Sequence, residues 1–192
     1  MATNIVTITH QYIKQWLTPG KITVDATVGQ GFDTLYLAEQ VGKMGHVYGF
    51  DIQPQAIRKT KERLKKAELL DRVTLYQAGH EQLDQYLPSD VQVDLGIFNL
   101  GYLPHGDKSI ITHPETTVPA VKQLLERLTP GGHVLIAAYI GHPGGLAEYE
   151  TLITFLSTLD QTQFAVGRFE FINQKHQPPK LILIERRSSH GA

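Results

Sequence analysis

The feature that most constrains the fold of this chain is a regular alternation of apolar runs with segments of helical periodicity. We interpret as strands the apolar runs at 22–27, 46–51, 73–77, 91–99 and 133–140. Helical patterns occupy the segments 32–41, 54–69, 119–128 and 146–159. Such alternation is typical of βαβ units, in which successive strands run parallel and helices cover the sheet. The sequence therefore predicts an α/β fold with a mostly parallel sheet.

The C-terminal part of the chain departs from this pattern. Two further strands are predicted at 164–172 and 181–187, and only residues 173–180 connect them. A connection this short cannot hold a crossover helix, so the two strands must pair antiparallel. We therefore expect a Rossmann-like, seven-stranded sheet with an antiparallel C-terminal hairpin and flanking helices, and a further helix at 5–17 ahead of the first strand.

The composition is that of an ordinary globular protein. With 192 residues, of which 41% are apolar and 19% charged, the chain can bury a sizeable core, and no linker divides it. We expect a single domain over 1–192, with an N-terminal helical segment at 1–18 and a frayed tail at 188–192. No apolar run is long enough to cross a membrane, and residues 1–16 lack the apolar centre of a secretory signal, so we expect a cytoplasmic protein.

The absence of cysteine and the spacing of histidine exclude several kinds of site. Without cysteine there is no cysteine nucleophile, which excludes methylation of a pyrimidine carbon through a covalent cysteine adduct. No two of the nine histidines lie within four residues of each other, so no helix face offers paired zinc ligands, and we predict no metal. The net charge of −1 does not decide about a nucleic-acid partner, because it can hide a local basic face.

The strongest local signal is the segment D-A-T-V-G-Q-G-F-D-T, residues 25–34, at the end of the first predicted strand. Gly29 and Gly31 let the backbone turn sharply and approach a ligand closely. Asp51 ends the second strand, where a carboxylate can accept hydrogen bonds from ribose hydroxyls. The segment A-G-H-E, residues 78–81, ends the third strand. Because ligands of open α/β sheets bind beyond the carboxyl ends of the strands, these segments predict a site for a nucleoside cofactor.

Two kinds of nucleoside cofactor use this geometry. The dinucleotide motif G-x-G-x-x-G requires glycine where this chain has Thr34, and the pyrophosphate of a dinucleotide is repelled by a negative charge such as Asp33 at the helix start. S-adenosylmethionine (SAM) instead carries a sulfonium and an ammonium group, which Asp25 and Asp33 complement. We therefore predict that the chain binds SAM, with S-adenosylhomocysteine as product, on the sheet of a class I SAM methyltransferase.

The residues predicted to contact the cofactor lie at the ends of the first four strands. They are Asp25, Val28, Gly29, Gln30, Gly31, Asp33, Asp51, Ile52, Gln53, Gly79, His80, Glu81 and Asn99. For Asp25, a capping or turn-holding role is an equally good interpretation. Gln53 is alternatively an exposed residue at a helix start, and His80 and Glu81 a capping pair; for these three we favour contact with the ribose or adenine.

Five motifs resemble those of a family labelled rRNA methylases, and together they extend over nearly the whole chain. The motifs are D-A-T-x-G-x-G-x-D-T (25–34), G-F-D-I-Q (49–53), N-L-G-Y-L-P (99–104), Y-I-G-H-P-G-G (139–145) and N-Q-K-x-x-P-P (173–179). Members of this family are implicated in methylating the 5-aminomethyl group on the wobble uridine of tRNA, often a 2-thiouridine. The resemblance therefore implies a SAM-dependent N-methyltransferase whose substrate is the anticodon stem-loop of tRNA.

The segment N-L-G-Y, residues 99–102, is also similar to the N-P-P-Y motif of methyltransferases that act on amino groups. The side-chain oxygen of Asn99 can accept a hydrogen bond from the target N–H, and a neighbouring carbonyl can accept another. Tyr102 can stack on a base, with packing at the base of the loop as the alternative. A neutral amine held in line with the methyl group then attacks it in one displacement, so positioning supplies most of the catalysis.

An aliphatic amine must lose a proton before it attacks, and His142, Asp107 and Tyr139 are the candidates to accept or relay it. We count His142 and Asp107, together with Asn99 and Tyr102, as candidate catalytic residues. The alternatives are a turn residue for His142, a solvated loop carboxylate for Asp107 and a packed aromatic for Tyr139. We expect His10 to be an exposed residue of the first helix, with an approach to the cofactor from that helix as the alternative.

The basic residues between 58 and 66 are expected to form the solvated face of a helix rather than an RNA surface. Better candidates for phosphate contacts are Lys175, Lys180, Arg168 and Arg186, nearer the expected acceptor end. The protein is expected to be a monomer or a homodimer. Three alternatives to tRNA methylation remain: a small-molecule N-methyltransferase, an rRNA N-methyltransferase, and a SAM-binding module without turnover.

Overall fold

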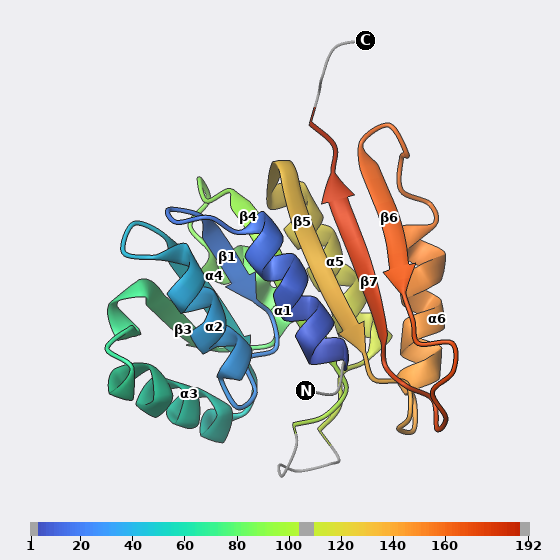
Figure 1. Cartoon of the computed structure of the whole chain (residues 1–192), viewed down its shortest axis with the longest axis horizontal. Coiled ribbons are helices and arrows are strands. Elements are labelled where there is room, and N and C mark those ends of the chain that lie inside the picture. Colours follow the sequence, from blue (N-terminus) through green and yellow to red (C-terminus); the bar gives the residue numbers. More distant parts are fainter. Residues whose placement is uncertain (1–3, 104–109, 189–192) are drawn as a thin grey trace.

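The computed structural model describes residues 4–103 and 110–188, in which seven strands form one sheet (Figure 1). The strands are β1 (Ile22–Asp25), β2 (His46–Asp51), β3 (Val73–Gln77), β4 (Val93–Leu100), β5 (Leu128–Ala138), β6 (Phe164–Phe169) and β7 (Lys180–Arg186). The α-helices are α1 (Ile5–Trp16), α2 (Phe32–Val41), α3 (Pro54–Lys66), α4 (Leu83–Tyr86), α5 (Pro114–Arg127) and α6 (Gly145–Leu156), and two 3₁₀ helices occupy Leu70–Arg72 and His80–Gln82.

The strand order β3-β2-β1-β4-β5-β7-β6 confirms the predicted class of sheet. Strand β1 pairs parallel with β2 and β4, β2 pairs parallel with β3, and β4 with β5. Strand β7 pairs antiparallel with both β5 and β6, as predicted for the C-terminal hairpin. The strand order reverses between β1 and β4, and ligands of such sheets bind at the carboxyl ends beside this reversal.

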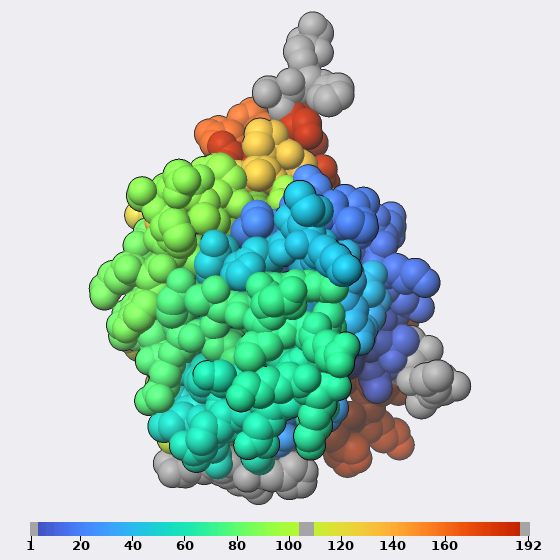
Figure 2. All heavy atoms as spheres, turned by 90° about the vertical axis from the view of Figure 1, so that its left-hand side faces the viewer, coloured from blue at the N-terminus to red at the C-terminus, as the bar shows by residue number. Residues whose placement is uncertain are grey.

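Helices cover both faces of the sheet. Helices α1, α2 and α3 lie on one face, and α4, α5 and α6 lie on the other (Figure 1). Seen from the β3 edge, the N-terminal helices and the segment around residues 80–100 lie on opposite sides (Figure 2). Each face buries its own apolar cluster, one centred on Leu37 and Leu64 and the other on Phe98 and Leu124. The central strands are therefore covered on both faces, which leaves their ends open to a ligand.

The rings of Trp16 and His133 hold α1 against β5. They stack with their centroids 3.8 Å apart. Helix α1 begins at the cap residue Asn4, whose side-chain oxygen accepts a hydrogen bond from the backbone N–H of Thr7. This end of α1 lies at the carboxyl edge of the central strands (Figure 1). No helix in the ranges 4–103 and 110–188 is long and apolar enough to cross a membrane.

Several predicted boundaries were wrong. Helix α5 begins at Pro114 rather than Pro119, because proline fits the first turn of a helix, while Pro119 lies inside it. Strand β5 begins at Leu128 rather than His133, since Leu128 pairs with Val93 before residues 129–132 interrupt the register. Strand β6 ends at Phe169, shorter than the predicted 164–172. Of the expected frayed tail 188–192, residues 189–192 lie outside the described part of the chain.

The closest approach in the β1–α2 turn is at Gly31, where we expect a substitution to be costly. Gly31 has a φ of +76°, and a Cβ there would lie 2.4 Å from the hydroxyl oxygen of Thr60 on α3. Gly31→Ala should therefore lower the free energy of unfolding by about 2–4 kcal/mol, from strain and overlap together. Gly20→Ala is the control, because Gly20 has a φ of +91° and open space around it. Equal losses in urea unfolding would show that contact with Thr60 adds nothing.

Candidate active site

Asp51, at the end of β2, holds the turn between β1 and α2 through hydrogen bonds. The backbone N–H of Gly29 donates to one carboxylate oxygen of Asp51 and the N–H of Gln53 to the other, both at 2.8 Å. Burial raises the pKa of Asp51, and the two N–H donors partly offset this. Val28 is buried, and its N–H donates to the carbonyl of Phe50, which ties the turn to β2. The predicted glycine turn and ribose carboxylate are thus in direct contact.

Arg63 of α3 supports the same turn from the side. Its Nε donates to the carbonyl of Gln30 at 3.1 Å, and its guanidinium lies 3.8 Å from the centroid of the Phe32 ring. This residue belongs to the basic run that the sequence analysis interpreted as a solvated face. Arg63 therefore stabilises the turn, a role that the pattern of charges between residues 58 and 66 does not indicate.

Asp25 is completely buried at the end of β1. One of its carboxylate oxygens accepts from the hydroxyl of Thr34 at 2.6 Å, and the other from the N–H of Thr27 at 3.2 Å. These contacts favour the turn-holding role, while direct contact with the cofactor stays a prediction. Burial, reinforced by the charge of Asp33, raises the pKa of Asp25 to about 7.

This raised pKa predicts a pH dependence of stability. The native state keeps a proton on Asp25 at pH values where the unfolded chain has released it, so the stability from this group is present below about pH 4 and is lost as the pH rises to about 7. Across that window, the free energy of unfolding of the wild type should fall by up to about 4 kcal/mol relative to Asp25→Asn. Urea unfolding of both proteins from pH 4 to 8 measures the difference. Parallel pH profiles would contradict this assignment.

The side of the site predicted to hold adenine combines apolar and polar groups. The side chain of Ile52 is 53% exposed although it is apolar, as expected of a surface that a flat ring covers. Gln53 is the cap residue of α3 and is buried, so the alternative of an exposed helix-start residue was wrong. Its side-chain oxygen accepts from Gln55 at 3.0 Å.

His80 lies buried at the end of β3. Its Nδ1 is 3.3 Å from the carbonyl of Ala26, an arrangement in which Nδ1–H donates and Nε2 remains an acceptor. Burial lowers the pKa of His80, which keeps the ring neutral. The buried Nε2 has no hydrogen-bond partner among the described residues. Gly79 and Glu81 flank His80, and a Cβ at Gly79 would lie 2.3 Å from the Glu81 carboxylate.

Asn99 lies at the end of β4, beside the point where the strand order reverses, and three groups orient it. Its backbone N–H donates to the hydroxyl of Thr27 at 2.7 Å. Its side-chain amide donates to Asp33 at 2.9 Å, and the other oxygen of Asp33 is 2.7 Å from Nε2 of His10. The amide nitrogen is thereby occupied, and the side-chain oxygen of Asn99 remains available as an acceptor.

His10 was expected to be exposed, and this was wrong. Its side chain is 28% exposed and its ring stacks on Tyr36 with the centroids 4.0 Å apart. The pairing with Asp33 brings α1 into the site. Sequence reasoning also missed Thr27, although it lies inside the D-A-T motif, because the hydroxyl acts on a strand that is distant in sequence.

Of the candidate catalytic residues other than Asn99, the structure brings Tyr102 and His142 into contact. The rings of Tyr102 and His142 meet edge to face, with centroids 5.8 Å apart, and Tyr102 is 42% exposed. Nδ1 of His142 is 3.0 Å from the carbonyl of Pro143, and Nε2 is enclosed without a partner among the described residues. Burial and the charge of Asp33 raise the pKa of Tyr139, which makes it a poor proton acceptor at neutral pH. Asp107 lies outside the described residues.

A buried carboxylate supports the segment that carries Tyr102. Glu148 of α6 is 1% exposed and accepts from the hydroxyls of Thr112 at 2.7 Å and Thr117 at 2.6 Å. The Thr112 hydroxyl in turn accepts from the N–H of Gly101 at 2.9 Å. This network was not predicted from the sequence, where its one signal is the acidic residue within an otherwise apolar helix face.

The four cations proposed for phosphate contacts differ in their surroundings. Lys180 and Arg168 both pair with Glu170. Arg186 donates to the carbonyl of Leu128, at the end of the sheet opposite to the site. Lys175 is exposed and makes no ion pair within residues 4–103 and 110–188. In those same ranges, no group of three or more acidic or histidine side chains could hold a metal ion.

Comparison with known proteins agrees with this geometry. The chain matches the model of the family described as "Putative rRNA methylase" over residues 47–185. The chloroplastic tRNA (mnm(5)s(2)U34)-methyltransferase of Arabidopsis thaliana is 35% identical over 187 residues, which cover 93% of this chain and 68% of the relative.

Two solved structures extend the comparison. A protein of Clostridium thermocellum with the same family description has a TM-score of 0.93 and 45% identity, covering 97% of this chain and 99% of its own. A protein of Streptococcus mutans described as a "putative methyltransferase", in complex with S-adenosylhomocysteine, has a TM-score of 0.86 and 36% identity, with the same coverage.

The residues on the carboxyl edge fit SAM. Gly29 and Gly31 have positive φ values and no side chain, so a ligand can approach the backbone of the turn. Asp51 ends the neighbouring strand, and the acceptor Nε2 of His80 has no hydrogen-bond partner among the described residues. Asp33 adds negative charge close to the turn. This chain belongs to the rRNA methylase family and is a SAM-dependent methyltransferase.

Proposed function

We propose that this methyltransferase acts on RNA, and that its acceptor is the amino nitrogen of the 5-aminomethyl group on the wobble uridine of tRNA. The observation that carries the proposal is the orientation of Asn99, whose amide nitrogen is held by Asp33 and whose oxygen is left to accept an N–H. The name of the Arabidopsis relative describes the same nucleoside. The absence of cysteine also favours attack by a nitrogen over methylation of a ring carbon.

The residues of the chain have distinct tasks in this reaction. When bound, SAM supplies a methyl group on a positively charged sulfur. Asp51 holds the ribose, and Asn99 accepts a hydrogen bond from the amine and aims its lone pair at the methyl carbon. The carbonyl of Leu100 already accepts from the N–H of Tyr139 at 3.0 Å, and its second lone pair can receive the other N–H of the amine.

The amine must reach Asn99 without its extra proton. Tyr139 is disfavoured as the acceptor of that proton by its raised pKa, so His142 and Asp107 remain as the candidates. Tyr102, exposed beside His142, provides a ring face on which a base of the RNA next to the acceptor can stack. We propose that the protein works in the cytoplasm, as a monomer or a homodimer, although the Arabidopsis relative is chloroplastic by name.

Nucleoside analysis tests the proposal. Deleting the gene should make the 5-aminomethyl form of the wobble uridine accumulate in tRNA and its methylated form disappear, as measured by mass spectrometry. The purified protein should then methylate tRNA from the deletion strain with labelled SAM, and ribonuclease should abolish the labelled product. An unchanged nucleoside pattern refutes the acceptor, and a product that resists ribonuclease indicates a small molecule instead.

A further inference from the structure

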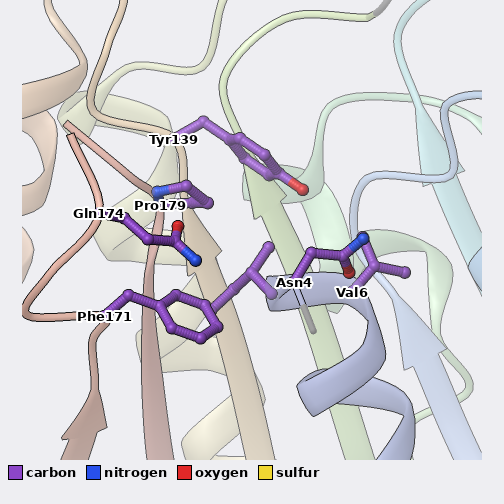
Figure 3. A pocket seen from close by; sticks show the side chains of 7 residues that line it. Asn4, Val6, Tyr139, Phe171, Gln174 and Pro179 are labelled. Carbon is purple, nitrogen blue, oxygen red and sulfur yellow. The ribbon is translucent and has the colours of Figure 1, made fainter. Parts of the chain in front are cut away.

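A cavity of about 230 Å³ lies beside the reacting end of the site, between α1 and the C-terminal hairpin (Figure 3). We call it the hairpin pocket. Its walls are the first residues of α1 from Asn4 to Val6, Tyr139 after β5, and three residues of the β6–β7 connection. Those three are Phe171, Gln174 and Pro179. Gln174 and Pro179 belong to the N-Q-K-x-x-P-P motif, and Phe171 lies just before it.

The pocket adjoins Asn99 through the paired ends of β4 and β5. Asn99 pairs with Ala137 in the sheet, and the N–H of Tyr139 donates to the carbonyl of Leu100. Burial raises the pKa of Tyr139, and the charge of Asp33 adds to this effect. Tyr139, a wall of the hairpin pocket, therefore lies at the same end of the sheet as Asn99, the residue that we propose to hold the acceptor amine.

The lining of the pocket suits a flat heterocycle. Figure 3 shows the amide of Gln174 between the rings of Tyr139 and Phe171, with Asn4 on the other side of the pocket. Phe171 is braced by Phe169, whose ring meets it at 90° with the centroids 5.0 Å apart. Aromatic faces of this kind stack on bases that have left a helix or loop.

Polar groups that have no hydrogen-bond partner among the described residues surround these aromatic faces. The side-chain oxygen of Asn4 accepts hydrogen bonds from Thr7, but its amide nitrogen has no hydrogen-bond partner among the described residues. The amide of Gln174 and the hydroxyl of Tyr139 also lack a partner among these residues. A uracil-type base presents two carbonyl or thiocarbonyl acceptors on either side of one N–H. Amide donors together with an amide oxygen are complementary to that edge.

The connection around the pocket also presents groups suited to an RNA strand. Lys175 is exposed and free of ion pairs within the described ranges, and Ile172 is 94% exposed. His176 and Gln177 adopt φ values of +63° and +52°, a backbone conformation that non-glycine residues seldom take. Cations position phosphates, and exposed apolar side chains contact bases.

We propose that the hairpin pocket receives the flipped-out pyrimidine base that carries the acceptor amine, stacked on Phe171 and read by Gln174 and Asn4, while Lys175 contacts a phosphate. This inference rests on the proposed function, because it names where that substrate is bound. It assigns the hairpin a part in substrate binding and separates the base pocket from the site of the cofactor.

Substitutions at Phe171 test the stacking. With a synthetic anticodon stem-loop carrying 5-aminomethyl-2-thiouridine at the wobble position, Phe171→Leu should raise KM about tenfold or more through loss of a base–aromatic stack. Phe171→Tyr, which keeps the ring, should stay close to the wild type. The Kd for SAM should be unchanged in both variants. Val166→Ala is the control, since Val166 is an exposed apolar residue of the same hairpin outside the pocket.

Crosslinking tests the location without any substitution. The same stem-loop with 4-thiouridine at the wobble position is irradiated on the wild-type protein, and the attached peptide is identified after trypsin. We expect attachment to the tryptic peptide 169–175, which contains Phe171 and Gln174, or at Tyr139. Crosslinks confined to other parts of the chain overturn the assignment, whatever the variants do.

The outcomes separate the two proposals. If the wild type methylates the stem-loop but Phe171→Leu keeps the wild-type KM, the pocket assignment is wrong and the proposed function stands. If the wild type methylates no tRNA, the proposed function fails and the pocket assignment fails with it. Activity on the stem-loop, a raised KM in Phe171→Leu alone and crosslinks in 169–175 or at Tyr139 support both.

Discussion

The variant Asn99→Ala is expected to lose about 10²–10³-fold in kcat for methyl transfer while keeping nearly the wild-type affinity for SAM. The alanine removes the oxygen that we propose to accept the N–H of the amine, and the backbone N–H that binds Thr27 is retained. Isothermal calorimetry with SAM and single-turnover methylation of tRNA separate the two effects. Loss of positioning without loss of cofactor is the signature of a residue that acts on the acceptor.

A matched control for this variant is Gln92→Ala. Gln92 is an exposed amide that directly precedes β4, at the end of the strand opposite to Asn99. It should leave both kcat and the Kd for SAM at wild-type values. If Asn99→Ala methylates tRNA at the wild-type rate, Asn99 does not hold the amine. If neither protein methylates any substrate while both bind SAM, the chain is a SAM-binding module.

Asp51→Ala is expected to weaken SAM binding by about a hundredfold. Hydrogen bonds to a charged group contribute about 1.5–3 kcal/mol each, and the variant loses those to the ribose hydroxyls. It also frees the N–H groups of Gly29 and Gln53, which Asp51 now fixes at 2.8 Å. Calorimetric titration with SAM measures the loss, and circular dichroism checks that the sheet has formed.

Asp71→Ala controls for removal of a carboxylate from the same part of the chain. Asp71 is exposed in the 3₁₀ helix Leu70–Arg72 that precedes β3, at the edge of the sheet away from the cofactor turn. Its SAM affinity should equal that of the wild type. A folded Asp51→Ala protein that binds SAM within threefold of the wild type would place the ribose elsewhere.

The topology could be predicted because most strands can be recognised from the apolar pattern of their own residues. Strands β1, β2, β4 and β5 are apolar runs, and the short connection between β6 and β7 leaves only antiparallel pairing. The boundaries that failed depend on distant contacts. Pairing of Leu128 with Val93 extends β5 across a Pro-Gly-Gly segment whose local preference is a turn.

In the candidate site too, features that depend on local sequence could be predicted, and features that depend on distant contacts could not. Asp51 and Asn99 could be placed because both end strands, and the carboxyl ends of parallel strands share one edge. Which of their neighbours they contact could not be predicted. The pairing of His10 with Asp33 depends on how α1 packs on β5, and the hydrogen bond from Thr112 to Glu148 depends on how α6 meets the segment after β4. Neither contact has a signal at short range in the sequence.

Helix α1 contributes His10, which helps to orient Asn99 through Asp33, and its first turn lines the hairpin pocket. We therefore expect a fused segment to disturb the site more at the N-terminal end of α1 than after β7. The N-terminal end of α1 opens on the carboxyl edge of the sheet, whereas β7 runs away from it to the opposite edge (Figure 1). An affinity tag fused ahead of Asn4 stands at the entrance for the substrate. A tag placed after Arg186 leaves that entrance clear, and recombinant enzyme for kinetic work is best built that way.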